Sequence, residues 1–419
     1  MLDLDKLADR LSMALTAALI ASFTLLPETI FGYAVFGGLL AAIFLLKTKG
    51  SFTFFVDAYF VLQALMIVFT IASLFWAEVP FWTGIKVRQQ IVNLGFTYLL
   101  YIAYSRDKDI WSLIKAFKWA GYIVAFYLIM YYGVSGILSM LTNAVRMDST
   151  EVTNANKLGM GVAWGCFFEF LEMAHYKKIN LSSLLVIPSI LVMSATQSRK
   201  AILILVIGGV LIYWLYFVNS QNFGKSLLGI CLFAALAVVI MQIFKSLPVF
   251  SGIYKRMEML LNFFSDEGEV GASVAARDLM IQAGWLQFLE KPILGIGIGN
   301  AGLAGRVVGV TEFWAYLHNN YIELLCGGGI IGFLVYYARY AYILWKLWLY
   351  RHSEGDILYP CIIVFIIKVI IDYAVVSFFE KPYEIDLLLL FLTFKCMEDQ
   401  KPAAEQSIRE TYRFKYIKG

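Results

Sequence analysis

The chain has 419 residues, of which 60% are apolar and only 15% are charged, and its formal net charge is +4. A soluble protein would contain about 45–50% apolar residues, so the excess indicates burial in lipid. With only 8 Pro the chain is not a disordered polymer, and its small net charge gives no indication of nucleic-acid binding. The 5 Cys lie in or beside apolar runs without metal-ligand spacing, so they predict neither a disulfide framework nor a zinc site.

Apolar runs long enough to cross a bilayer recur along the chain. A hydrocarbon core of ~30 Å needs about 20 mostly apolar residues per helix. We therefore predict an all-α, polytopic integral membrane protein with about twelve transmembrane helices. They lie near residues 11–26, 30–46, 54–76, 90–104, 119–136, 157–174, 181–197, 201–218, 226–246, 317–345, 357–377 and 384–396. Because the runs at 90–104 and 384–396 are short, eleven or thirteen spans are the alternatives.

Lysine and arginine distinguish the two sides of the membrane. They gather in the N-terminal segment, in the C-terminal tail and in loops such as 106–118. Positive residues favour the cytoplasm, so both ends of the chain are predicted to be cytoplasmic. We expect a membrane domain over residues 1–400 and a basic cytoplasmic tail over 401–419 that contacts anionic membrane lipid. The long segment 247–316 then lies on the extracytoplasmic face, is predicted to be partly helical, and is the expected place for chemistry.

Three side chains on this outer face are suited to chemistry. Arg199 opens a span and Arg277 lies in an amphipathic stretch, and a guanidinium is a planar, permanently charged fork that suits phosphate oxygens. His318 lies where the chain re-enters the membrane, and an imidazole can take a proton from a hydroxyl near neutral pH. Plainer interpretations are a snorkelling Arg199, a solvated Arg277 and a helix-capping His318.

Other motifs indicate little. The segment Pro292–Asn300 carries alternating glycines but lacks the strand and helix of a dinucleotide-binding site, so the glycines favour close backbone approach instead. We find no phosphate-binding loop and no carboxylate cluster for a catalytic metal, so we expect neither a cofactor nor a metal. Lys368 and Asp372 are four residues apart in one predicted helix and can pair.

Three features together resemble the O-antigen ligase and O-antigen polymerase superfamily of bacterial cell-envelope glycosyltransferases. They are Ser198-Arg199 at the start of a span, Arg277 followed by Pro292 and the Gly295–Asn300 run, and His318–Leu325 with glycines beyond it. The sequence departs from the family pattern at Lys200, where a small residue is common. It departs again at Cys326-Gly327-Gly328, where a Glu-x-Gly pattern is frequent, and both departures weaken any choice of subfamily.

The resemblance implies a donor of undecaprenyl diphosphate carrying a glycan and an acceptor that is another glycan or the lipid A core. It places the protein in the bacterial inner membrane with its site on the periplasmic face. By this analogy Arg199 and Arg277 hold the diphosphate, and His318 deprotonates the acceptor hydroxyl, which attacks the anomeric carbon with inversion and without ATP or metal. Further substrate contacts are expected from Ser198, Lys200, Asn300, Asn319, Tyr321 and Glu323.

Several functions share these features. We favour a ligase-type transferase, and a polymerase of O-antigen or capsular polysaccharide in the same superfamily is the alternative because the donor site would be shared. A multispanning transporter or flippase of lipid-linked glycan is the alternative from another class. It predicts internal repeats around a midplane site, and no convincing repeat relates the two halves of the chain. A purely structural membrane protein would leave the cationic outer segment without a role.

Overall fold

A computed structural model shows the chain as a bundle of helices. The structure describes residues 4–51, 56–105, 110–143, 145–147, 154–218, 272–307, 309, 315–351 and 355–417, with scattered positions between 242 and 258. Every regular element within these ranges is helical, which confirms the predicted all-α fold. The predicted span at 226–246 and most of the segment 247–271 lie outside the described residues.

Each predicted span that the structure describes contains a helix, but some ends differ, since the helix predicted from residue 317 begins at Asn320 and the one predicted to reach residue 377 ends at Asp372. The helices are α1 (Leu4–Leu25), α2 (Ile30–Thr48), α3 (Ala58–Ala72), η1 (Ser73–Phe75), α4 (Pro80–Tyr104), α5 (Trp111–Thr142), α6 (Ala155–Tyr176), η2 (Leu181–Leu185), α7 (Val186–Ala195), α8 (Arg199–Phe217), α11 (Ala272–Glu290), α12 (Gly302–Val307), α13 (Asn320–Leu349), α14 (Gly355–Asp372) and α15 (Lys381–Ile417). Two of them bend where a glycine leaves helical geometry, α5 at Gly133 and α13 at Gly329.

Six of the described helices are long and apolar enough to cross a membrane. They are Lys6–Leu25, Ile30–Thr48, Ala58–Phe75, Trp111–Thr142, Arg199–Phe217 and Asn320–Leu349. This set makes the chain a polytopic membrane protein. The predicted count of about twelve spans stays a prediction, because six of the described helices qualify by length and hydropathy.

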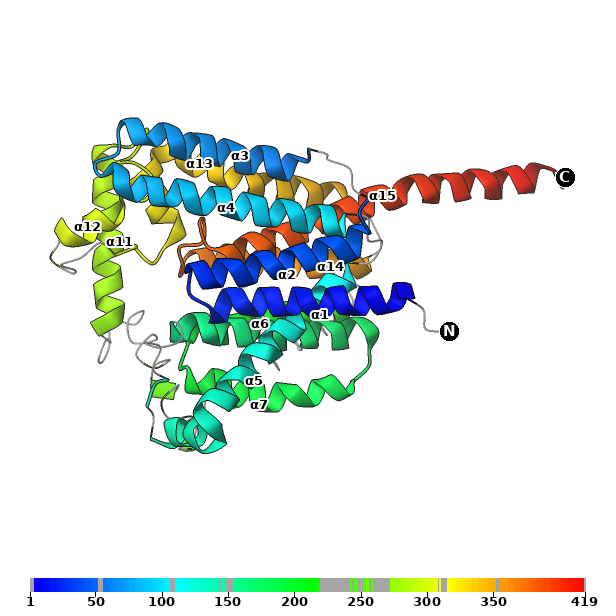
Figure 1. The fold of residues 1–419 in the computed structure, drawn as a ribbon, viewed down its shortest axis with the longest axis horizontal. Helices are drawn as coiled ribbons and strands as arrows, with labels where there is room; N and C mark the ends of the chain where they lie inside the picture. Colours follow the sequence, from blue (N-terminus) through cyan, green and yellow to red (C-terminus); the bar gives the residue numbers. More distant parts are fainter. Residues whose placement is uncertain are drawn as a thin grey trace.

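The two ends of the bundle differ. Both chain termini lie at one end, where α15 continues beyond the other helices, whereas α11 and α12 lie across the opposite end (Figure 1). The predicted domain boundary at residue 400 falls inside α15, which runs without interruption to Ile417. The long segment predicted to hold the chemistry therefore contributes its described helices to the end that is remote from the termini.

Small residues let the central helices approach closely. α5 packs on both α1 and α6, and α6 packs on α8. A Cβ atom placed on Gly121 of α5 would lie 2.4 Å from the Cα of Gly165 in α6, so the two backbones touch at this point. Close approach of this kind drives helix association in lipid, where hydrophobic burial between helices contributes little.

Several ionisable groups inside the bundle form ion pairs. Lys118 lies 2.6 Å from Glu172, Arg339 lies 2.6 Å from Glu384, and the predicted pair of Lys368 and Asp372 is confirmed at 3.2 Å. Charges in an apolar medium are tolerated only when they are paired and hydrogen-bonded. The pairs therefore explain how helices that carry charges can pack into the bundle.

The glycine-rich segment after α11 packs against protein. Gly295, Gly297 and Gly299 all have positive φ angles of 66°, 99° and 88°. A Cβ on Gly295 would meet the backbone of Cys326 and Gly327 in α13, and one on Gly297 would meet Ala77. The expectation of close backbone approach is confirmed, and the partners are α13 and the corner between η1 and α4.

Replacing Gly121 by Ala should destabilise the bundle, because the added methyl cannot fit beside the backbone of Gly165. Overpacking of a tight contact costs about 1–3 kcal/mol, so we expect a lower melting temperature for the detergent-solubilised protein. Gly38→Ala is the matched control, since this glycine of α2 has open space around its Cα. Equal melting temperatures for Gly121→Ala and wild type would contradict the close α5–α6 contact.

Candidate active site

The turn between α7 and α8 presents two cations at the start of a helix. Ser198 is the N-cap of α8, and its hydroxyl accepts a hydrogen bond of 3.4 Å from the backbone N–H of Ala201. Serine is favoured at this position because it satisfies a free N–H of the first helical turn. Arg199 and Lys200 then occupy the first turn of α8. The positive end of the helix dipole adds to their charge, so this turn favours an anion.

Neighbouring elements fix this turn in place. Arg146, which follows α5, donates from Nε to the carbonyl oxygen of Thr196 at 3.3 Å and from Nη2 to Oδ1 of Asn156 at 3.1 Å. A Cβ on Gly159 of α6 would lie 2.4 Å from Oγ1 of Thr196, so α6 packs directly against the turn. The positions of Arg199 and Lys200 are therefore set by the ends of α5 and α6.

α11 brings Arg277 to the same end of the bundle and rests on the segment that carries His318. A Cβ on Gly284 of α11 would lie 2.3 Å from the side chain of Leu317 and 2.8 Å from that of Ile322. Met280 and Leu317 belong to one small buried cluster beneath α11. Arg277 itself is half-buried. Packing of α11 on this segment therefore fixes Arg277 relative to His318.

His318 is held by hydrogen bonds on both sides of it in the chain. Glu323 accepts a hydrogen bond of 2.8 Å from the N–H of Leu317, and Asn319 caps α13 by accepting from the N–H groups of Tyr321 and Ile322. The backbone of His318 has a φ angle of 59°, which is uncommon for a residue with a side chain. Such conformations persist where the surroundings impose them, and they cluster at active sites.

The imidazole of His318 is half-buried among positive charges. Its ring centroid lies 4.3 Å from that of Tyr316, and Nδ1 is a buried atom without a hydrogen-bond partner in the described part of the chain. Burial first, and then the charges of Arg277 and Lys200, lower the pKa of His318 to about 3. The imidazole is therefore neutral at physiological pH and able to accept a proton.

Lys200 lies within electrostatic range of Arg199 and Arg277, and His318 lies within electrostatic range of Arg277 and Lys200. Among the described residues, the charged groups that act on the ammonium group of Lys200 are the cations Arg277, Arg199 and Arg146. Burial lowers the pKa of Arg277, and the phenol of Tyr316 partly opposes that shift. Four cations thus share one small region of the protein, and their mutual repulsion would be relieved by a bound anion.

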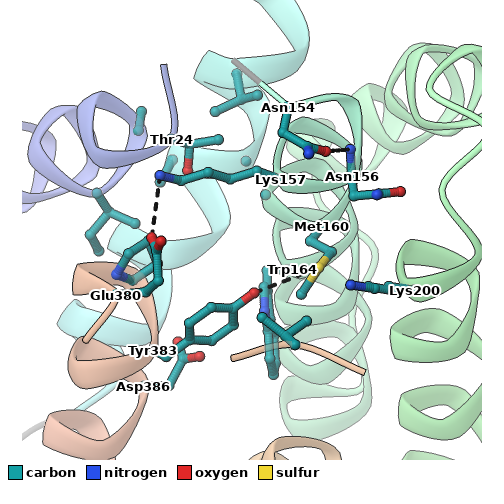
Figure 2. A pocket seen from close by; sticks show the side chains of 18 of the residues that line it. Thr24, Asn154, Asn156, Lys157, Met160, Trp164, Lys200, Glu380, Tyr383 and Asp386 are labelled. Carbon is teal, nitrogen blue, oxygen red and sulfur yellow. Dashed lines mark hydrogen bonds and ion pairs between the residues drawn. The ribbon is translucent and has the colours of Figure 1, made fainter. Parts of the chain in front are cut away.

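A pocket of about 290 Å³ opens beside these cations. Its polar lining residues include Asn156, Lys157, Lys200, Tyr316 and Glu380, and its apolar lining residues include Ile20, Ala21, Phe117, Ala120 and Val124. Along α6 the lining runs from Asn156 to Trp164, which is about 12 Å of helix. Figure 2 shows Lys200 entering the pocket from α8, while Lys157 and Glu380 reach toward each other. The pocket is therefore amphipathic, and Lys200 and Tyr316 connect it to Arg277 and His318.

Of the predicted site residues, only Lys200 lines this pocket, and Arg199, Arg277 and His318 lie outside its lining. Asn300 is fully buried, accepts from the N–H of Val79 at 2.9 Å and donates to Oγ1 of Thr83 at 3.0 Å. Tyr321 donates to the carbonyl oxygen of Val369 at 2.7 Å and so joins α13 to α14. Ser198, Asn319 and Glu323 make the backbone hydrogen bonds described above. Substrate contact by these residues stays a prediction, and the structure gives each of them a place in the frame around the site.

Arg146 contacts the turn before α8 and Lys157 lines the pocket, and neither was predicted as a site residue. Both are cations on the predicted outer side, which the positive-inside rule disfavours. That disagreement with the rule is the signal in the sequence that points to them.

Residues 184–337 match the family model described as O-Antigen ligase. The match runs from η2 to the middle of α13 and includes Arg199, Arg277 and His318. It leaves out Arg146 and Lys157, and with them the pocket lining from α1, α5, α6 and α15. No curated protein matches the chain.

The imidazole of His318 should remain neutral in the ligand-free protein between pH 5 and pH 8, because its pKa is lowered to about 3. NMR of 15N-histidine-labelled protein would then show no titration of the signal that His318→Ala removes. In Arg277→Gln the loss of one positive charge should raise the pKa of His318. A midpoint near 6.5 in the unsubstituted protein would show that the ring is solvated, contrary to this structure.

Proposed function

We infer that the chain, whose residues 184–337 match the O-antigen ligase family model, is a membrane glycosyltransferase of that superfamily. It moves a glycan from undecaprenyl diphosphate to the hydroxyl of an acceptor sugar. The observation that carries this proposal is the cluster of cations around Lys200 beside the neutral imidazole of His318. The cations suit a diphosphate, and the neutral imidazole suits a hydroxyl that must lose a proton.

The pocket supports a donor that is part lipid and part anion. Its apolar walls come from α1 and α5, and its polar lining includes Lys157 and Lys200. A polyprenyl chain would lie along the apolar walls, and the diphosphate would lie against Lys200, Arg199 and Arg277. Guanidinium groups bind phosphate oxygens bidentately, and the N-terminus of α8 adds its dipole.

The reaction we propose is a single displacement. Neutral His318 takes the proton of the acceptor hydroxyl, whose oxygen attacks the anomeric carbon of the donor from the face opposite the phosphate, so the configuration inverts. The bond between that carbon and the phosphate oxygen breaks, and undecaprenyl diphosphate leaves with the electron pair. Arg199 and Arg277 stabilise the charge that develops on it. Cleavage of the sugar–phosphate bond supplies the free energy, so the proposed transfer needs neither ATP nor a metal.

Donor binding would also make the imidazole of His318 a stronger base. The positive charges that lower the pKa of His318 are those that the diphosphate neutralises. An anion at Arg277 and Lys200 therefore raises the basicity of the imidazole at the moment when a proton must be removed. Glu323 and Asn319 act as positioning residues, because their hydrogen bonds hold the backbone on either side of His318.

The acceptor decides between the two activities of this superfamily. Transfer to the lipid A core would make the protein a ligase, as we propose, and transfer to another lipid-linked repeat unit would make it a polymerase. The donor site would serve both reactions equally. The proposed location is the bacterial inner membrane, with this site on the periplasmic face.

His318→Ala should lower transfer by about 10²–10⁴-fold, because the general base is lost. The assay uses purified protein, lipid-linked oligosaccharide and candidate acceptors without ATP, and it measures the new glycosidic product. His175→Ala is the matched control, since His175 stacks on Trp111 with ring centroids 4.1 Å apart in the half of α6 remote from the pocket. Export of unmodified substrate without any product would favour a transporter and contradict the proposal.

Arg199→Lys and Arg277→Lys should each reduce transfer by about ten- to a hundredfold. A lysine keeps the charge but not the bidentate fork, and a charge-assisted hydrogen bond contributes about 1.5–3 kcal/mol. Arg306→Lys, on the exposed part of α12, should leave the rate unchanged. Wild-type turnover in both site variants would remove these arginines from the proposed mechanism.

A further inference from the structure

One ion pair spans the pocket. Nζ of Lys157, in the first turn of α6, lies 3.6 Å from Oε2 of Glu380, which immediately precedes α15. Both residues line the pocket, and Figure 2 shows their side chains meeting from opposite walls. An occupant of the polar part of the pocket would therefore meet this pair.

The pair is weak for two reasons. A separation of 3.6 Å is longer than a charge-assisted hydrogen bond of about 2.7–2.9 Å, and each side chain is 32% exposed. Ion pairs that stay this accessible to water contribute little to stability. By contrast, Lys118 and Glu172 in the interior lie 2.6 Å apart and are almost completely buried. The contact between Lys157 and Glu380 can therefore be exchanged for another at little cost.

The charges around the pocket favour such an exchange. The carboxylate of Glu380 acts on Tyr316, which also lines the pocket and adjoins His318. The acids of the lining, Glu380 and Asp386, repel an incoming diphosphate, whereas Lys157 and Lys200 attract one. The ammonium group of Lys157 is thus paired with Glu380, which a diphosphate donor would displace.

We propose that Lys157 is a further ligand of the donor's diphosphate, and that Glu380 occupies it while the pocket is empty. This inference rests on the proposed function, because it takes the ligand to be a lipid-linked diphosphate. Donor entry then breaks the Lys157–Glu380 ion pair and forms a Lys157–phosphate pair. No covalent bond changes in this step.

The two partners of the pair should have opposite effects on binding. The probe is undecaprenyl diphosphate without a sugar, titrated into the full-length protein in nanodiscs. Lys157→Gln should weaken binding by about three- to tenfold, since one phosphate contact is lost. Glu380→Gln should strengthen binding by about two- to tenfold, because the competing carboxylate is gone and Lys157 is released. In the double variant the gain from Glu380→Gln should shrink, which is the signature of two coupled residues.

A second ion pair on the segment after α11 provides the control. Lys291 lies 2.8 Å from Glu78, the side chains are 48% and 36% exposed, and neither residue lines the pocket. Lys291→Gln and Glu78→Gln should leave the affinity unchanged. Lys157→Arg keeps the charge and should retain most of the binding, which separates loss of a ligand from loss of folding. Weaker or unchanged binding in Glu380→Gln, or unchanged binding in Lys157→Gln, would overturn the inference.

The test separates this inference from the proposed function, because the probe carries no sugar to transfer. Opposite effects on binding, together with no transfer to any acceptor, would support the anion site and reject the transferase. Normal transfer, together with unchanged affinity in both variants, would reject the role of Lys157 and keep the transferase. Failure of the wild-type protein to bind the probe would reject both.

Discussion

Repulsion among cations at one end of an apolar bundle is the constraint on which the site depends. Lys200 is buried, and among the described residues the charged groups that act on it are Arg146, Arg199 and Arg277. Cations do not remain together in such a place unless the fold holds them there or an anion joins them. In this protein the cap at Ser198, the close contact at Gly159 and the packing of α11 hold the cations in place. A bound diphosphate would neutralise their charge.

The same charges explain how a histidine can serve as a base at this position. A buried imidazole beside cations stays unprotonated, and it becomes more basic when an anion neutralises those cations. When the diphosphate neutralises these cations, it is bound more tightly and the pKa of His318 rises at the same time. The strained backbone of His318, between hydrogen bonds from Glu323 and Asn319, keeps the ring beside Tyr316 while this happens.

The sequence was sufficient for the helices, because the hydropathy of a segment indicates whether lipid or water surrounds it. It also selected Arg199, Arg277 and His318, whose role in a site stays a prediction. It was not sufficient for Lys157 or Arg146. A cation at the end of a span has the same local sequence whether it snorkels to lipid or lines a pocket, and only tertiary packing distinguishes the two. The hydroxyl of Tyr321 donates a hydrogen bond to Val369 of α14, and this contact also depends on tertiary packing that the local sequence does not show. The bends at Gly133 and Gly329 likewise depend on neighbouring helices and have no counterpart in hydropathy.

The central claim is that the cations around Lys200 hold a diphosphate next to His318. An electron cryo-microscopy structure of the full chain with undecaprenyl diphosphate bound in a nanodisc would test it most directly. We expect phosphate oxygens within hydrogen-bond distance of Arg199 and Arg277, the polyprenyl chain along the apolar walls from α1 and α5, and His318 facing the terminal phosphate. Phosphate density at the end of the bundle that carries the termini, or remote from both guanidinium groups, would contradict it.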